Sequence, residues 1–246
     1  MIRMKKIIIS FLLLSSIVSC AQQKSSTDDI LKKAGGIFGK KGKGGLSNED
    51  VVAGLKEALS VGARNSSEKL SALDGFFANA AIKVLMPQEA KKVESTLRNI
   101  GLGDMVDKAI LSMNRAAEEA SKSAAPIFVD AITSMSIQDA FGILKGSDSA
   151  ATVYLKGKTT ADLTNAFKPV IESALEKTNA TKYWKDVFDT YNKLPTTFNK
   201  INTDLSGYVT DKALTGLFFQ VALEEQKIRK DPAARVTDIL KKVFGS

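Results

Sequence analysis

Apolar residues recur at three- and four-residue spacing from Ser47 to the C-terminus, which is the pattern of amphipathic α-helices. Strict alternation of apolar and polar residues, typical of half-buried strands, is missing from the same region. Ser47 and Ser136 each stand three residues before an aspartate, as in the capping box that opens a helix. The pattern therefore predicts an all-α fold, a single multi-helix domain of about nine or ten helices with no sheet.

Prolines, glycines and the apolar periodicity indicate where these helices begin and end. Pro87 and Pro126 suit first helical turns, and Gly101 suits a helix end. Trp184 and Phe188, one turn apart, are expected to pack in the core. About 200 residues bury roughly 70% of their unfolded surface, so the domain needs neither a metal nor a disulfide for stability. Further helices are predicted near residues 160–178, 181–194, 207–230 and 232–244.

The first 20 residues follow a different pattern. Basic residues precede an apolar run from Ile7 to Leu14 and a stretch of small residues, the layout of a secretory signal too short to span a bilayer. The run Ile17-Val18-Ser19-Cys20 resembles the signal of bacterial lipoproteins, and it contains the one cysteine of the chain. This resemblance implies that residues 1–19 are a cleaved signal peptide and that Cys20 carries acyl chains such as palmitate. The alternative is an ordinary secreted protein that loses Cys20 with its signal.

Lipidation of Cys20 would make a membrane the first partner of the protein. More than one acyl chain gives stable anchoring, so the mature protein would be held on a membrane without a transmembrane helix. Ala21 and Gln22 follow the cysteine, and by resemblance to lipoprotein sorting signals they favour the outer membrane, facing the periplasm. We therefore expect a lipid-anchored protein of the bacterial cell envelope.

The formal net charge of +8 is concentrated at the N-terminus. Residues 1–49 hold nine basic and three acidic side chains, which leaves a net charge of only +2 for residues 50–246. No basic stripe of the kind that binds nucleic acid is evident, so nucleic acid is not an expected partner. The glycines and lysines of residues 20–46 predict a flexible tether. The alternative is a short interfacial helix with an apolar face made of Ile30, Leu31, Ala34, Ile37 and Phe38.

Several stretches of the helical region resemble a family of uncharacterised bacterial proteins, catalogued as domain of unknown function 4197. The similarity covers residues 49–246. The family has no established activity, so the resemblance implies a fold and no mechanism. The stretches are DGFFANAAIKVLMP (74–87), MNRAAEEASKSAAPIF (113–128), ATVYLKGKTT (151–160) and the segment that begins YVTDKALTG and ends ILKKVFG (208–245).

The residue types present limit the chemistry that the protein can perform. The chain has no histidine, and its one cysteine is Cys20, so Ser-His-Asp triads, cysteine catalysis and the commonest zinc ligands are excluded. Carboxylate, lysine, tyrosine and hydroxyl groups remain. No metal and no other cofactor is expected.

Two groups of charged residues are candidates for such chemistry. Glu225 falls near the middle of an apolar helix face, with Arg229 one turn further on. A buried carboxylate must be paired or protonated, so a structural pair of Glu225 and Arg229 is expected; a catalytic Glu225 and an exposed one are the alternatives. The second group, in MNRAAEEA, contains Glu118 and Glu119. There, Arg115 and Glu119 are predicted to form a solvent-facing ion pair.

These features favour a non-enzymatic, membrane-anchored helical protein that binds or scaffolds a partner, such as another envelope protein. An enzyme is one alternative, and it requires Glu225, Arg229, Glu118 and Glu119 to converge on one solvent-reachable pocket. A carrier of a lipid or another apolar ligand is a further alternative. It requires a contiguous apolar cavity of a few hundred Å³ between helices.

Overall fold

The computed structural model describes residues 47–193 and 200–231. The chain divides into two units, residues 1–45 and 46–246, and every described residue belongs to the second. The predicted signal peptide, Cys20, the tether and the helix expected near 232–244 lie outside the described residues.

All regular structure in the described residues is helical: eight α-helices and one 3₁₀ turn, with no strand. The all-α class predicted from the sequence is therefore confirmed, and the number of helices in this part of the chain is somewhat lower than predicted. The elements are α2 (Asn48–Ser71), η1 (Gln88–Ala90), α3 (Lys91–Asn99), α4 (Gly103–Ser121), α5 (Ala124–Thr133), α6 (Ile137–Leu144), α7 (Ala150–Lys177), α8 (Ala180–Asn192) and α9 (Leu205–Lys230).

Local side-chain chemistry sets several helix boundaries as predicted. Ser47 and Ser136 both form capping boxes with the aspartate three residues on, each partner accepting the other's backbone N–H. Gly101 follows α3 with a φ of 85°, a conformation that glycine adopts without strain. One boundary was predicted wrongly: α7 begins at Ala150, ten residues before the expected start. The hydroxyl of the buried Thr159 donates to the Leu155 carbonyl one turn back, so this polar group is paired inside the helix.

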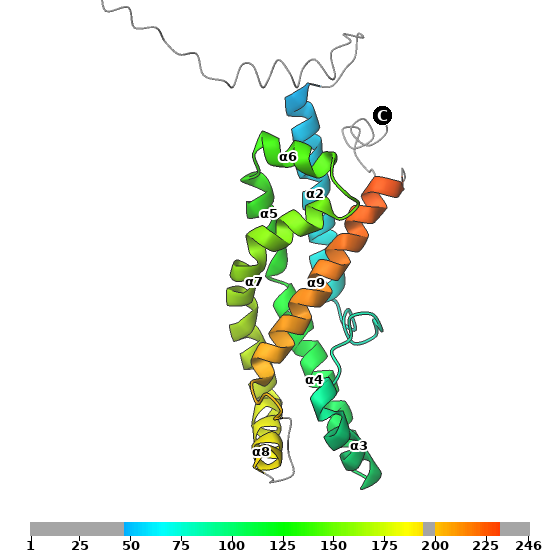
Figure 1. Cartoon of the computed structure of the whole chain (residues 1–246), viewed down its shortest axis with the longest axis vertical. Helices are drawn as coiled ribbons and strands as arrows, with labels where there is room; N and C mark the ends of the chain where they lie inside the picture. Colours follow the sequence, from blue (N-terminus) through cyan, green and yellow to red (C-terminus); the bar gives the residue numbers. More distant parts are fainter. Residues whose placement is uncertain (1–46, 194–199, 232–246) are drawn as a thin grey trace, which may run out of the picture. The chain divides into compact units, whose positions relative to one another are not determined.

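The core forms where α9 packs against α7, α2 and α4 (Figure 1). In this core Phe128 of α5 and Phe218 of α9 meet edge to face, with ring centroids 5.9 Å apart. Phe76, from the segment between α2 and η1, lies directly on α9 at Gly216. A Cβ at Gly216 would lie 2.6 Å from the Phe76 ring, so this contact requires glycine.

α3, the start of α4 and α8 lie at the end of the bundle away from α6 (Figure 1). The main helix contact of α3 is with α4, whereas α8 packs against α7 and α9. Both α4 and α8 pack against α7 and α9, and an open groove lies between α4 and α8.

Candidate functional site

Glu225 on α9 is buried, with its side chain 4% exposed, and its carboxylate accepts five hydrogen bonds. Three come from the start of α7: the N–H groups of Ala151 and Thr152, at 3.0 and 2.8 Å, and the Thr152 hydroxyl, at 2.8 Å. The other two come from Nε and Nη2 of Arg229, at 3.0 and 2.8 Å. No side chain at the start of α7 caps that helix, so Glu225 supplies both an acceptor and a negative charge to its first turn.

Arg229 connects this carboxylate to the end of another helix. Its Nη2 also donates to the carbonyl oxygen of Ile143, at 2.9 Å, in the last turn of α6, where the helix dipole favours a cation. The predicted pairing of Glu225 with Arg229 is therefore confirmed. The cavity beside the pair has a volume of about 10 Å³, room for no more than a water molecule.

Glu118 on α4 has similar surroundings. Its side chain is 5% exposed, and Oε1 accepts the backbone N–H groups of Phe76 and Phe77, at 3.1 and 3.2 Å. Its other oxygen, Oε2, accepts a hydrogen bond of 2.6 Å from Nη1 of Arg115. The two amides belong to residues 72–87, an irregular segment that would otherwise bury unpaired backbone groups.

Asn114, one turn before Glu118, holds the same segment at its far end. Its Oδ1 accepts the N–H of Val84 at 2.9 Å, and its Nδ2 donates to the Val84 carbonyl at 2.8 Å. Asn114 is fully buried, so these bonds satisfy polar groups that no solvent reaches. Asn114 and Glu118 therefore act as anchors for the connection between α2 and η1.

The predicted ion pair of Arg115 with Glu119 is wrong. Arg115 binds Glu118 instead, and its Nη2 donates to Asp74 at 2.7 Å. The Glu118 carboxylate, followed by Asp74, raises the pKa of Arg115. Glu118 is the better partner because it is buried, where the attraction between charges is stronger than in water. Glu119 is exposed and pairs with Lys122 at 2.6 Å.

The structure keeps the two groups of candidate residues apart, with Glu225 and Arg229 in one place and Glu118 and Glu119 in another. Phe76, whose N–H binds Glu118, packs on Gly216, nine residues before Glu225 and so about 13 Å along α9. Glu119 lies on the solvent face of α4. Neither buried carboxylate belongs to the lining of the apolar groove or of the polar cavity described next.

An apolar groove of about 500 Å³ lies between α4 and α8. Leu102, Met105 and Tyr183 are 40, 45 and 58% exposed, so apolar surface is open to solvent there. Two exposed charged residues, Asp104 and Lys108, also border it. The apolar lining consists of Met86, Leu97, Leu102, Met105, Val106, Ala109, Met113, Ala180, Tyr183, Trp184, Phe188 and Leu205.

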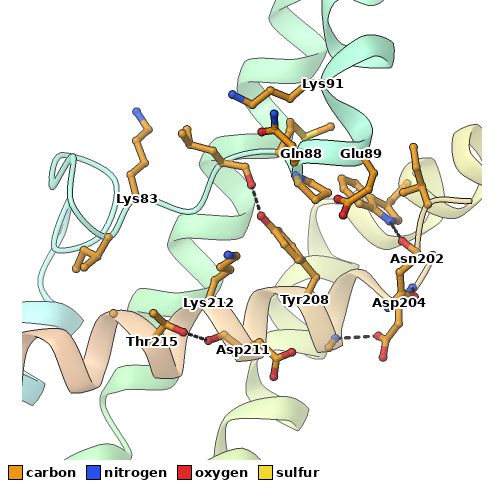
Figure 2. A pocket seen from close by; sticks show the side chains of 18 of the residues that line it. Lys83, Gln88, Glu89, Lys91, Asn202, Asp204, Tyr208, Asp211, Lys212 and Thr215 are labelled. Atoms are coloured by element: carbon orange, nitrogen blue, oxygen red, sulfur yellow. Dashed lines mark hydrogen bonds between the residues drawn. The ribbon is translucent and has the colours of Figure 1, made fainter. Parts of the chain in front are cut away.

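A larger and more polar cavity, of about 860 Å³, lies between residues 81–91, residues 200–204 and the first half of α9 (Figure 2). The hydroxyl of Tyr208 donates to the carbonyl of Leu85 at 2.8 Å and so ties two of its walls together. Burial, followed by the nearby charge of Glu89, raises the pKa of Tyr208. The charged residues of the lining are Lys83, Lys91, Lys200, Lys212, Glu89, Asp204 and Asp211.

Met86 and Trp184 line both cavities. The Trp184 ring packs 4.5 Å from Phe188 and 6.5 Å from Tyr208, centroid to centroid, and its Nε1 donates to the carbonyl of Asn202 at 3.2 Å. Trp184 is 5% exposed, so its expected place in the core is confirmed. Sequence reasoning missed the cavities on either side of it, because helical spacing says which residues share a face and not how far neighbouring helices diverge.

The described residues contain neither a grouped set of metal ligands nor a single helix that could span a membrane. No three histidine, cysteine, aspartate or glutamate side chains among them are grouped so as to hold a metal ion. None of the described helices is by itself long and apolar enough to cross a bilayer. The segments Gly103–Thr133 and Ile137–Leu144 meet that test only as a pair bent by 108°.

The fold and its cavities define an all-α domain in which an apolar groove adjoins a polar cavity. The chain belongs to a family described as a protein of unknown function, DUF4197, whose model matches residues 45–245. The family resemblance seen in the sequence is thereby confirmed. No match to the chain was found among curated proteins or among solved structures.

The stretches that carry the family resemblance hold one another in place. In the first, residues 74–87, the N–H groups of Phe76 and Val84 donate to Glu118 and Asn114 of the second. The third, residues 151–160, begins with the amides that bind Glu225 of the fourth. The two buried carboxylates in these stretches, Glu118 and Glu225, therefore have a structural explanation that requires no catalysis.

Proposed function

We propose that this protein is a lipid-anchored binding protein of the bacterial cell envelope that acts without catalysis and holds an apolar chain in the groove between α4 and α8. Acyl chains on Cys20 would anchor it, most simply to the outer membrane facing the periplasm, and residues 20–46 would act as the tether. This location rests on the lipoprotein-like signal alone.

The observation that carries the binding function is the groove itself. Its volume of about 500 Å³ falls in the range of small-ligand sites, which are lined mainly by apolar and aromatic side chains. Met86, Met105 and Met113 are part of the lining, and methionine adapts its shape to irregular apolar ligands. An apolar ligand fits this surface better than a polar one, because a polar ligand would lose its hydration there without gaining partners.

The buried carboxylates argue for binding over catalysis. The oxygens of Glu225 accept five hydrogen bonds and those of Glu118 accept three, and the Glu225 pair borders a cavity of only about 10 Å³. A general acid or base must reach a substrate proton at hydrogen-bond distance. The Glu225 carboxylate has no room for a substrate beside it, and Glu118 lines neither the apolar groove nor the polar cavity.

Trp184 provides a direct test, because it is the one tryptophan of the chain and lines the groove. Dibrominated stearate, a chain that quenches tryptophan at short range, should quench Trp184 emission with saturation in the chain from residue 21 to 246. That chain keeps the whole unit 46–246.

A pair of matched variants locates the binding. Met105→Lys places a charge in the groove at a position that is 45% exposed. It should raise the stearate concentration needed for half-maximal quenching at least tenfold. Val153→Lys makes the same kind of change at a 66% exposed site on α7, and it should have no effect. Unsaturable quenching, or equal effects of the two variants, would refute the proposal. Tight binding of a helical peptide with no binding of stearate would point to a protein partner instead.

A further inference from the structure

The two cavities share a wall, and this arrangement suits a ligand with two chemically different ends. Met86 and Trp184 border both the apolar groove and the polar cavity. A chain that lies in the groove against these two side chains has the polar cavity directly behind them. Met86 has three rotatable side-chain bonds, so it is the part of this wall best able to adjust to a ligand.

The polar cavity carries an excess of positive charge. Four lysines and three carboxylates line it, and one carboxylate, that of Asp204, already accepts the N–H of Gly207 as the cap of α9. Among the described residues the four lysines form no ion pair with a carboxylate. Lys83 is held over the ring of Phe77, 3.8 Å from its centroid, which leaves the others better placed for a ligand.

Lys91 and Lys212 are the most suitable of these. Lys91 opens α3, whereas Lys212 lies on α9 with its ammonium 5.6 Å from the ring centroid of Tyr208 (Figure 2). Both are exposed, so their charges remain available to a ligand in the cavity. The Tyr208–Leu85 hydrogen bond fixes the walls from which they extend.

We propose that the ligand is a single-chain amphiphile with an anionic phosphate head, whose chain lies in the apolar groove and whose head lies in the polar cavity beside Lys91 and Lys212. This inference rests on the proposed function, because it names the ligand class of the same groove. Lysine acts as a point charge toward phosphate and does not demand a fixed geometry, which suits an open cavity.

The test compares ligands that differ in one part, using competition against dibrominated stearate on the chain from residue 21 to 246. Lysophosphatidic acid should bind about tenfold more tightly than a monoacylglycerol with the same chain. The double variant Lys91→Gln/Lys212→Gln should abolish this preference and leave the affinity for monoacylglycerol unchanged. Glycerol 3-phosphate, the head without a chain, should compete at least a hundredfold more weakly.

Lys108→Gln is the matched control, because Lys108 borders the apolar groove and not the polar cavity. It should leave the preference for phosphate intact; if it removes the preference, the head binds at the groove and the inference is wrong. Equal binding of the two lipids would also overturn the inference while leaving the proposed function standing. If neither lipid nor stearate binds, the proposed function itself fails.

Discussion

Replacing Glu225 tests whether this carboxylate is part of the framework of the fold. In Glu225→Ala, the first amides of α7 lose their acceptor, and the guanidinium of Arg229 is left partly buried without its carboxylate. Removing one partner of a buried ion pair costs about 3–5 kcal/mol, because the remaining charge loses its compensating carboxylate while it stays desolvated. Domains have total stabilities of about 5–15 kcal/mol, so this loss would be a large fraction of the whole.

The adjacent residue is a suitable control. Glu224 is only half-buried, and its contacts with Asn65 and Gln220 are both long, at 3.4 Å. Glu224→Ala should therefore cost less than about 1 kcal/mol. Urea unfolding of the chain from residue 21 to 246, followed by circular dichroism at neutral pH, measures the loss of stability in both variants. In thermal unfolding, roughly 2–4 °C per kcal/mol predicts that the melting temperature of Glu225→Ala falls by about 6–20 °C.

A double variant separates the ion pair from simple loss of packing. Glu225→Ala/Arg229→Ala removes both charges, so it should cost clearly less than the sum of the two single variants. If Glu225→Ala is no more destabilising than Glu224→Ala, the carboxylate does not stabilise the start of α7. If the double variant equals the sum, the two side chains act independently, and the interpretation of Arg229 as the bridge to α6 fails.

Three further predictions address other parts of the chain. Glu118→Ala should destabilise the fold by about 2–4 kcal/mol, because it leaves the amides of Phe76 and Phe77 without their acceptor and removes the buried partner of Arg115, which keeps only Asp74. Glu119→Ala should change the stability by less than about 0.5 kcal/mol in the same urea assay. Hydrogen bonds from Ser136 lower the pKa of Asp139. The contribution of Asp139 to stability is therefore present above the ordinary aspartate pKa and is lost as the pH falls through the lower folded-state pKa. Carboxyl-carbon NMR titration should show this low pKa, and Ser136→Ala should raise the pKa of Asp139. Cys20→Ala should release the protein from membranes and abolish metabolic fatty-acid labelling, and unchanged labelling would contradict lipidation.

Local signals were enough to predict the helical class and several helix ends. The capping boxes at Ser47 and Ser136 depend on residues three apart, and the stop at Gly101 depends on one residue, so both are readable from short stretches. The burial of Glu225 followed from the helical phase of its apolar neighbours. The start of α7 was missed because Gly157 and the neighbouring threonines weaken helix propensity, and packing against α4 and α9 overrides it.

Partners that are distant in sequence could not be predicted in this way. Arg115 pairs with Asp74, 41 residues away, and Glu118 accepts hydrogen bonds from the amides of an irregular segment. Helical spacing fixes neither interaction. The cavities depend on how far α4 and α8 diverge, which is a property of several helices together. These are tertiary features, and a helical wheel for one segment contains no information on them.

One local signal nevertheless bears on the choice between a catalytic and a structural carboxylate. The first turn of α7 contains no acidic residue, and Ser149, which precedes it, makes no side-chain capping bond. The first amides of a helix need acceptors, so a helix start that is buried and lacks a local cap must obtain one from elsewhere in the fold. Glu225 is that acceptor, supplied by another helix. A buried glutamate in a chain that also contains an uncapped helix start is therefore better explained first as a cap, and Glu225 becomes a candidate for catalysis only if α7 stays intact without it.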